Sequence, residues 1–394
     1  MMIQAVLGNP NHPEYGVATI PFPIPHDQYA HCMELLEALE IGDAVKADCK
    51  VEKIDSFYTV LKRVEMLTVN VEELNYLAKR LDSFDTGEAA QFQAMAHKLE
   101  LLGLKDLINL TFCCQQATVI TDFSDLAAIG RDHYMNLHGG SASVDELNKL
   151  DSEETARRLI ESGSGTITPY GVVYDNGMKL EQVYDGRFFP CYYYEPNAIT
   201  VAVTSKAEPE DTEHITWLFL PMVQEEIDRA LLRGGITDSA DVRLRLEDSQ
   251  LPNEVDVLLD MEYETLSDLN ELAAATDGLS KADMEKLGAG VMLAEPKSAA
   301  QIKNLAEHLD LFDFAPGAHT PEEYGKYMIR QSGRFDYDEN LDAFYDYEKY
   351  GTERMNEEDG MFTDRGYIAY KGYISMEEVM NGSQSSHMEM GGMM

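Results

Sequence analysis

The hydrophobic positions of this chain follow the same order of patterns twice. Each time, two short apolar runs typical of strands are followed by an amphipathic helix and then by a third strand. In the first half these elements are predicted at 2–7, up to Pro21, at 26–39 and at 44–54. In the second half they are predicted at 198–204, up to Pro221, at 222–233 and at 241–247.

The two halves also share a gap-free register with an offset of 195 residues. Residues 73–77 (ELNYL) recur as 268–272 (DLNEL), and the pattern G-x-x-T-x-x-G begins at Gly165 and again at Gly360. Single matches arise often by chance, but a constant register over about a hundred residues is typical of an internal duplication.

Predicted helix starts follow the same offset. A helix start favours a short polar side chain that accepts a hydrogen bond from a free backbone N–H, often with an acid three residues later. The paired candidates are Asn70 with Thr265, Asp85 with Ser280, and Asp125 with Thr320. Three coincident starts indicate one fold used twice.

We therefore predict the α+β class. The fold is expected to be two tandem repeats of a β-β-α-β unit, each followed by helices and a short β-hairpin, at 166–174 and at 361–370. The predicted domains are 1–190 and 196–374, and residues 375–394 are predicted to be a flexible tail, rich in Gly, Ser and Met from Asn381 onward.

Charge is the strongest feature of the composition. Seventy-one Asp and Glu residues against 31 Lys and Arg residues give a formal charge of −40, and 44% hydrophobic residues suffice for ordinary cores. The first 200 residues hold about 30 acids and 15 bases, and the remainder about 41 and 16. The charge is thus expected on folded domains, either as a solubilising surface or as a surface that docks on a basic partner. Direct binding of nucleic acid is not expected, because phosphates would be repelled.

Cysteine spacing and the pattern of apolar stretches bear on the cellular compartment. Five cysteines without framework spacing are typical of reduced thiols. The N-terminus has no basic region before an apolar run, and no apolar stretch approaches the length of a membrane span. We expect a cytoplasmic protein without a membrane segment.

Candidate chemistry is weak. Residues 336–342 (DYDENLD) have the first oxygen positions of a calcium loop, but Leu341 and Tyr347 stand where that loop needs Gly and Glu. Cys114 with His133 or His138 could form a nucleophile and base, yet the surrounding leucine-rich pattern favours packed side chains. We predict no enzyme activity, no cofactor and no bound metal. The chain has too many acids to single out a catalytic carboxylate pair.

A local signature lies near the C-terminus. Residues 345–351 read YDYEKYG, and 360–368 read GMFTDRGYI; upstream, 217–221 read WLFLP and 266–270 read LSDLN. In this order and spacing they resemble the ArdA antirestriction family over residues 198–372.

This resemblance implies a protein of a mobile genetic element that mimics B-DNA and occupies the DNA-binding groove of type I restriction–modification enzymes, at their methyltransferase and specificity core. Family members are elongated dimers. The residues expected to stand in for phosphates are Asp336, Asp338, Glu339, Asp342, Asp346, Glu348, Glu353, Glu357, Glu358 and Asp359.

Departures from the family pattern leave alternatives open. The chain is twice the usual family unit, and residues 150–156 of the first repeat lack the tyrosine-rich motif found at 345–351. Two copies in one chain could form a pseudo-dimer or extend a homodimer. The alternative function is an acidic adaptor or chaperone for another basic protein, and a weaker one is a carboxylate-based metal enzyme.

Overall fold

The computed structural model describes residues 3–207 and 212–382, which divide into two units. Unit 1 comprises Met1–Glu195, Thr212–Thr216 and Val223–Thr237. Unit 2 comprises Pro196–Asp211, Trp217–Met222 and Asp238–Met394. Within the described residues, no helix is both long and apolar enough to span a bilayer.

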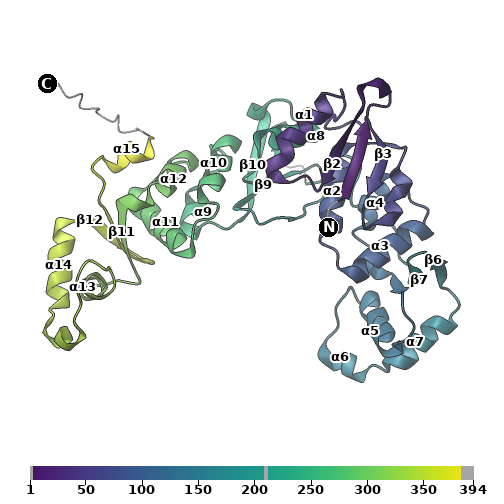
Figure 1. Cartoon of the computed structure of the whole chain (residues 1–394). Helices are drawn as coiled ribbons and strands as arrows, with labels where there is room; N and C mark the ends of the chain where they lie inside the picture. Colours follow the sequence, from purple (N-terminus) through teal and green to yellow (C-terminus); the bar gives the residue numbers. More distant parts are fainter. Residues whose placement is uncertain (1–2, 208–211, 383–394) are drawn as a thin grey trace. The chain divides into compact units, whose positions relative to one another are not determined.

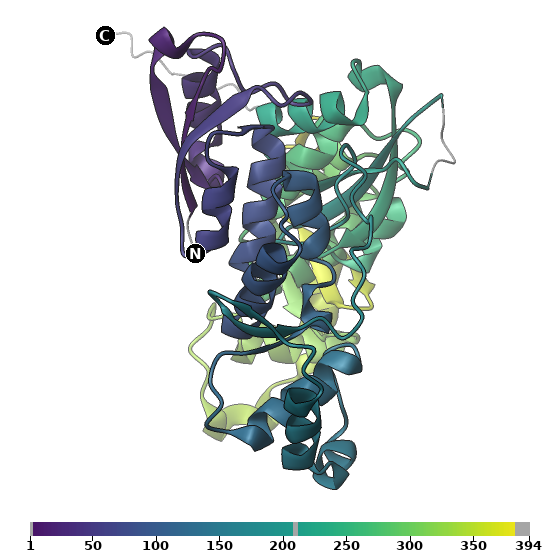
Figure 2. The same ribbon diagram turned by 90° about the vertical axis from the view of Figure 1, so that its right-hand side faces the viewer.

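The first part of unit 1 is a four-stranded sheet with helices packed against it (Figures 1 and 2). Its strands lie in the order β2-β1-β3-β4, with β1 antiparallel to both neighbours. Ile3, Ala5 and Leu7 of β1 are buried, because alternate side chains of a strand face the same side. The bounds are β1 Ile3–Gly8, β2 Val17–Phe22, α1 Tyr29–Glu37, β3 Cys49–Asp55, β4 Thr68–Val69, α2 Val71–Asp82, α3 Thr86–Lys98 and α4 Leu104–Leu110.

The second part of unit 1 combines a small sheet with three helices. The strand order is β5-β7-β6, and α5 packs against α7. The bounds are β5 Thr118–Ile120, α5 Leu126–Leu137, α6 Val144–Lys149, α7 Ser152–Glu161, β6 Thr166–Thr168 and β7 Gly171–Tyr174. Helix α8, Gln224–Gly234, is grouped with unit 1 although it follows Glu195 in the chain. Short 3-10 turns lie at Pro13–Tyr15, His26–Gln28, Thr59–Val64 and Cys114–Gln116.

Unit 2 contains two three-stranded sheets, in the orders β10-β8-β9 and β11-β13-β12. The bounds are β8 Ile199–Ser205, β9 Thr216–Leu220, β10 Val242–Ser249, α9 Asn253–Leu258, α10 Leu266–Thr276, α11 Lys281–Ala294, α12 Ala299–Ala306, β11 Phe312–Pro316, α13 Pro321–Arg330, α14 Tyr347–Glu357, β12 Asp359–Thr363, β13 Gly366–Tyr370 and α15 Met376–Met380. The 3-10 turns are Ser239–Asp241, Leu309–Leu311 and η7, Glu339–Phe344. Helices and small antiparallel sheets together confirm the α+β class.

All six predicted helix caps are confirmed. In each, the side chain of the cap accepts a hydrogen bond from the backbone N–H three residues later. At Asp85 the bond is reciprocal, because the Glu88 carboxylate accepts from the Asp85 backbone N–H. Where a flexible tail was expected from residue 375, the structure has α15, capped by Ser375. The rest of that segment, 383–394, lies outside the described residues.

Side chains at the predicted offset make the same contacts in each half. Asn75 accepts a hydrogen bond from the Ile24 backbone at 2.9 Å, and Asn270 accepts one from the Met222 backbone at 2.8 Å. In the hairpins, Thr168 donates to the Gly171 carbonyl at 2.8 Å, as Thr363 does to the Gly366 carbonyl. These matched contacts support the duplication, which stays a prediction, as does the division into domains at 190 and 196.

Candidate functional site: the acidic segment of unit 2

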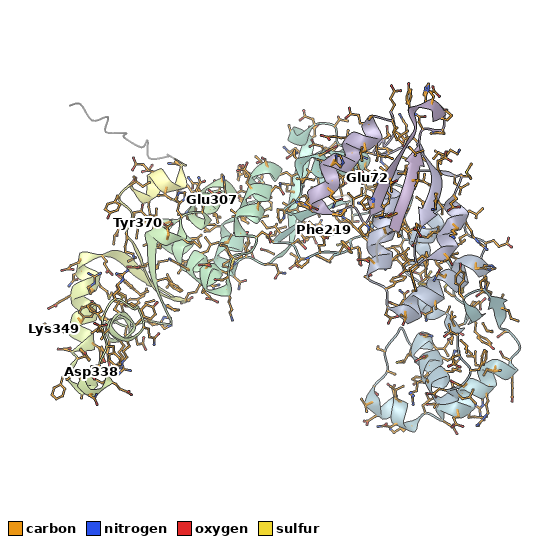
Figure 3. All side chains as sticks on the ribbon, viewed as in Figure 1. Glu72, Phe219, Glu307, Asp338, Lys349 and Tyr370 are labelled. Carbon is orange, nitrogen blue, oxygen red and sulfur yellow. The ribbon has the colours of Figure 1, made fainter. Side chains whose placement is uncertain are left out.

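The ten predicted contact residues lie on one continuous stretch, residues 330–359, which we call the acidic segment. It runs from the end of α13 through η7 and α14 to the start of β12. The stretch contains ten acids and four bases. Figure 3 places Asp338 beside the η7 turn and Lys349 on α14 at this end of unit 2.

Close packing of α13 on α14 provides the scaffold of the segment (Figure 1). A Cβ atom at Gly325 would lie 2.1 Å from the Tyr347 carbonyl oxygen, and one at Gly351 would lie 1.9 Å from the Pro321 carbonyl oxygen. Both distances are shorter than real Cβ contacts, so the two helices approach this closely only because both residues are glycine.

Eight of the ten acids are exposed. Some lie in or beside the η7 turn, and the others lie on α14 or next to its ends. The eight are Asp336, Asp338, Glu339, Asp346, Glu348, Glu353, Glu357 and Asp359. Asp338 and Asp346 also cap η7 and α14 through backbone N–H groups. Exposed ion pairs such as Lys349–Glu353, at 3.9 Å, contribute little to stability and leave these carboxylates accessible to a partner.

Asp342 differs from these eight because its carboxylate, although partly exposed, has three hydrogen-bond partners within the segment. It accepts hydrogen bonds from the hydroxyls of Tyr337, at 2.6 Å, and Tyr347, and from the Arg330 guanidinium. The hydrogen bonds from Tyr337 and Tyr347, together with Arg330, lower the pKa of Asp342 to about 2. Asp342 therefore fixes the η7 turn to α13 and α14.

This environment predicts how the turn responds to acid. Because the folded pKa of Asp342 is depressed from 3.8 to about 2, its contacts stabilise the turn fully above pH 3.8 and are lost as pH falls through about 2. A side-chain carboxyl NMR titration should show a midpoint near pH 2. The Asp342→Asn variant serves as the control. It has no carboxylate at this position, so the NMR signals of Tyr337 and Tyr347 should not change between about pH 4 and pH 2. A midpoint at an ordinary aspartate pKa would contradict the prediction.

Glu358 is the second acid with an internal role. Its side chain is 9% exposed; it accepts a hydrogen bond from the Tyr324 hydroxyl at 2.6 Å and pairs with Arg354. Burial raises the pKa of Tyr324, and the carboxylate beside it acts in the same direction. Glu358 thus joins α13 to the end of α14.

The exposed aromatic side chains of the segment were not singled out from the sequence. Tyr347 is buried and Tyr350 is half-buried, in edge contact with Phe335 at 5.8 Å between ring centroids. In contrast, Phe344 of η7 is 84% exposed and Leu341 is 47% exposed. No hydrophobic periodicity indicates such exposure, because a six-residue turn is too short to show one.

The geometry does not favour a metal site or a cysteine–histidine catalytic pair among the described residues. Among residues 3–207 and 212–382, no group of three or more His, Cys, Asp or Glu side chains could hold a metal ion. Cys114 is fully buried, and burial raises the pKa of its thiol, which disfavours the nucleophilic thiolate. His133 contacts the Thr118 hydroxyl at 2.9 Å, and burial lowers its pKa.

Comparison with known families adds to this geometry. Residues 212–369 match the family model described as antirestriction protein (ArdA). This match covers less than half of the chain and confirms, for residues 212–369, the resemblance to the ArdA antirestriction family predicted from the sequence. The family comprises inhibitors, not enzymes, that act on type I restriction–modification systems. The comparison with curated proteins found no match.

Proposed function

We propose that this protein inhibits type I restriction–modification enzymes by mimicking DNA. The exposed carboxylates of the acidic segment stand in for phosphates and bind the DNA-contacting surface of the methyltransferase and specificity core. The observation that carries the proposal is the set of eight exposed acids on one end of unit 2, within a segment that has only four bases. The inhibition needs no cofactor and no chemical step.

The magnitude of the charge supports this proposal. Duplex DNA carries one charge per roughly 1.7 Å of axis, so 40 net charges correspond to about 70 Å of duplex. Such a surface steers association with a basic groove and makes the affinity sensitive to salt.

Competition with DNA tests the proposal. A purified type I methyltransferase core is loaded with labelled duplex DNA, and the full chain is added at several salt concentrations. The protein is expected to displace the duplex and to bind less tightly as salt rises. If excess protein at low salt neither binds the core nor displaces DNA, the proposal fails. Equal binding to unrelated basic proteins would favour the adaptor function instead.

Charge removal at matched sites makes the test specific. Four acids of the segment are neutralised together: Asp336→Asn, Glu339→Gln, Glu348→Gln and Asp359→Asn. The control neutralises four exposed acids of unit 1: Glu37→Gln, Asp55→Asn, Glu161→Gln and Glu195→Gln. We expect about tenfold weaker binding and a shallower salt dependence for the first variant, because fewer cations of the enzyme are neutralised. The control should change affinity by less than about threefold, and equal losses would argue against this segment as the contact surface.

A further inference from the structure

The η7 turn exposes its large apolar side chains as well as most of its polar ones. Asp342 is partly exposed and hydrogen-bonded to Arg330 and two tyrosines, while Leu341 and Phe344 are exposed. Residues three apart in a 3-10 helix eclipse each other, so Leu341 and Phe344 lie on one face of the turn. Single exposed apolar residues are common, but two on one face of a hydrogen-bonded turn are not explained by its own folding.

The exposure of Phe344 does not come from a loose turn. The Asp338 carboxylate accepts a hydrogen bond from the Asn340 backbone at 2.9 Å, and the Leu341 N–H donates to the Asp338 carbonyl at 3.0 Å. Asp342 adds side-chain contacts to both α13 and α14. The turn is therefore fixed before any partner binds, which lowers the entropy cost of using its outer face for binding.

The surrounding charge defines the partner. Asp336, Asp338, Glu339 and Asp346 are all exposed and lie within a few residues of the apolar face. A second copy of this chain would bring the same carboxylates against them, and like charges repel at an interface. A basic surface with an apolar hollow satisfies both the carboxylates and the two apolar side chains.

We propose that Phe344, with Leu341 beside it, enters an apolar hollow within the basic DNA-binding surface of the inhibited enzyme. This inference rests on the proposed function and adds an anchor to it. Methyltransferases that act on DNA take the target base out of the stack into a snug pocket, where aromatic and apolar side chains stack on it, so an enzyme of this class offers such a hollow inside its basic groove. Aromatic side chains that fill a pocket at the centre of an interface commonly dominate its binding energy.

Salt dependence separates this anchor from the carboxylates. The affinity of the full chain for a purified type I methyltransferase core is measured at four or more salt concentrations for Phe344→Ala and for Tyr263→Ala, an aromatic residue of unit 2 that is 79% exposed. For Phe344→Ala we expect affinity to fall by about ten- to a hundredfold at every salt concentration, with an unchanged slope, because apolar burial releases no counterions. Tyr263→Ala should stay within about twofold of the unchanged protein.

The outcomes are distinct. If the unchanged protein binds the core and Phe344→Ala binds as well as Tyr263→Ala, the anchor is disproved while the proposed function stands. If Phe344→Ala instead changes the oligomeric state and spares binding to the core, the face is an interface between copies and the inference is again wrong. If the unchanged protein does not bind the core, the proposed function fails and the anchor fails with it. The thermal unfolding of Phe344→Ala should be unaltered, since its side chain is 84% exposed.

Discussion

Replacing Gly325 with alanine is expected to separate α13 from α14 and to abolish the ordered acidic segment. The added Cβ would lie 2.1 Å from the Tyr347 carbonyl oxygen and 2.9 Å from its carbonyl carbon. Both are backbone atoms of α14, so no flexible side chain can move aside. Overpacking of this kind costs typically about 1–3 kcal/mol, and a clash between two backbones belongs at the upper end. Because η7 is attached to both helices through Asp342, its order depends on the same contact.

The matched control is Gly290→Ala in α11. This glycine is also helical and buried, but its added Cβ would have only the Ile368 side chain nearby, at 3.9 Å, which is ordinary contact. We expect Gly290→Ala to be neutral or to stabilise by about 0.5–1 kcal/mol, since alanine favours helix over glycine. Hydrogen exchange of the amides of α13 and α14 in the full chain measures both variants. Equal protection of these helices in the two variants would contradict the argument.

Much of the fold could be predicted from the sequence, because the helix-cap signals recur at the 195-residue offset between the two halves. Asn70 and Thr265 both precede amphipathic runs, and both cap helices in the structure. Gly130 and Gly325 occupy matching positions at the offset of 195, and each allows a close helix contact, with Ser152 or Tyr347. The offset between the halves thus relates two helix–helix contacts that hydrophobic periodicity within one half does not predict.

The details of the candidate site could not be predicted in the same way. All ten acids look equivalent in the sequence, yet Asp342 and Glu358 have internal partners that come from α13. Which acid gains a partner on α13 depends on the packing of α13 on α14, and pattern reasoning does not contain that information. Phe344 lies on the same turn as Asp342, and its 84% exposure is likewise not indicated by the sequence pattern. Phosphate mimicry by the other eight residues stays a prediction.

Helix α8 shows a further limit of sequence reasoning. The expected boundary near residues 190–196 assigns it to the second repeat, whereas its contacts group it with unit 1. Arg229 of α8 donates to the Glu72 carboxylate at 2.6 Å, with both side chains largely buried. Arg233 is 4% exposed, and its guanidinium lies 4.4 Å from the centroid of the Phe189 ring. In the sequence, Arg229 and Arg233 lie one helical turn apart, a spacing typical of a solvent-exposed helix face.

Arg233 is held by an unusually complete set of acceptors. These are backbone carbonyls and polar side chains of unit 1: Arg187 O at 2.8 Å, Ala44 O at 3.0 Å, the Asn70 side chain at 3.0 Å, Gly186 O at 3.2 Å and the Tyr184 hydroxyl. The Glu73 carboxylate lies 3.7 Å from the guanidinium and accepts from Tyr184 at 2.8 Å. Removing the guanidinium leaves these groups buried without their donor, which is costlier than losing the hydrogen bonds alone.

We therefore expect Arg233→Met to destabilise unit 1 by about 3 kcal/mol or more, although methionine retains most of the apolar volume. Arg233→Lys should recover only a small part of this loss, because an ammonium cannot reproduce the planar fork of donors. The control is Arg157→Ala, which removes a unit 1 arginine from an exposed pair with Glu153 and should cost about 0.3–0.5 kcal/mol. Hydrogen exchange of α2 and α8 amides in the full chain is the suitable measurement, because a two-unit chain need not unfold in one step. Equal exchange free energies for Arg233→Met and Arg157→Ala would show that α8 is only loosely held to unit 1.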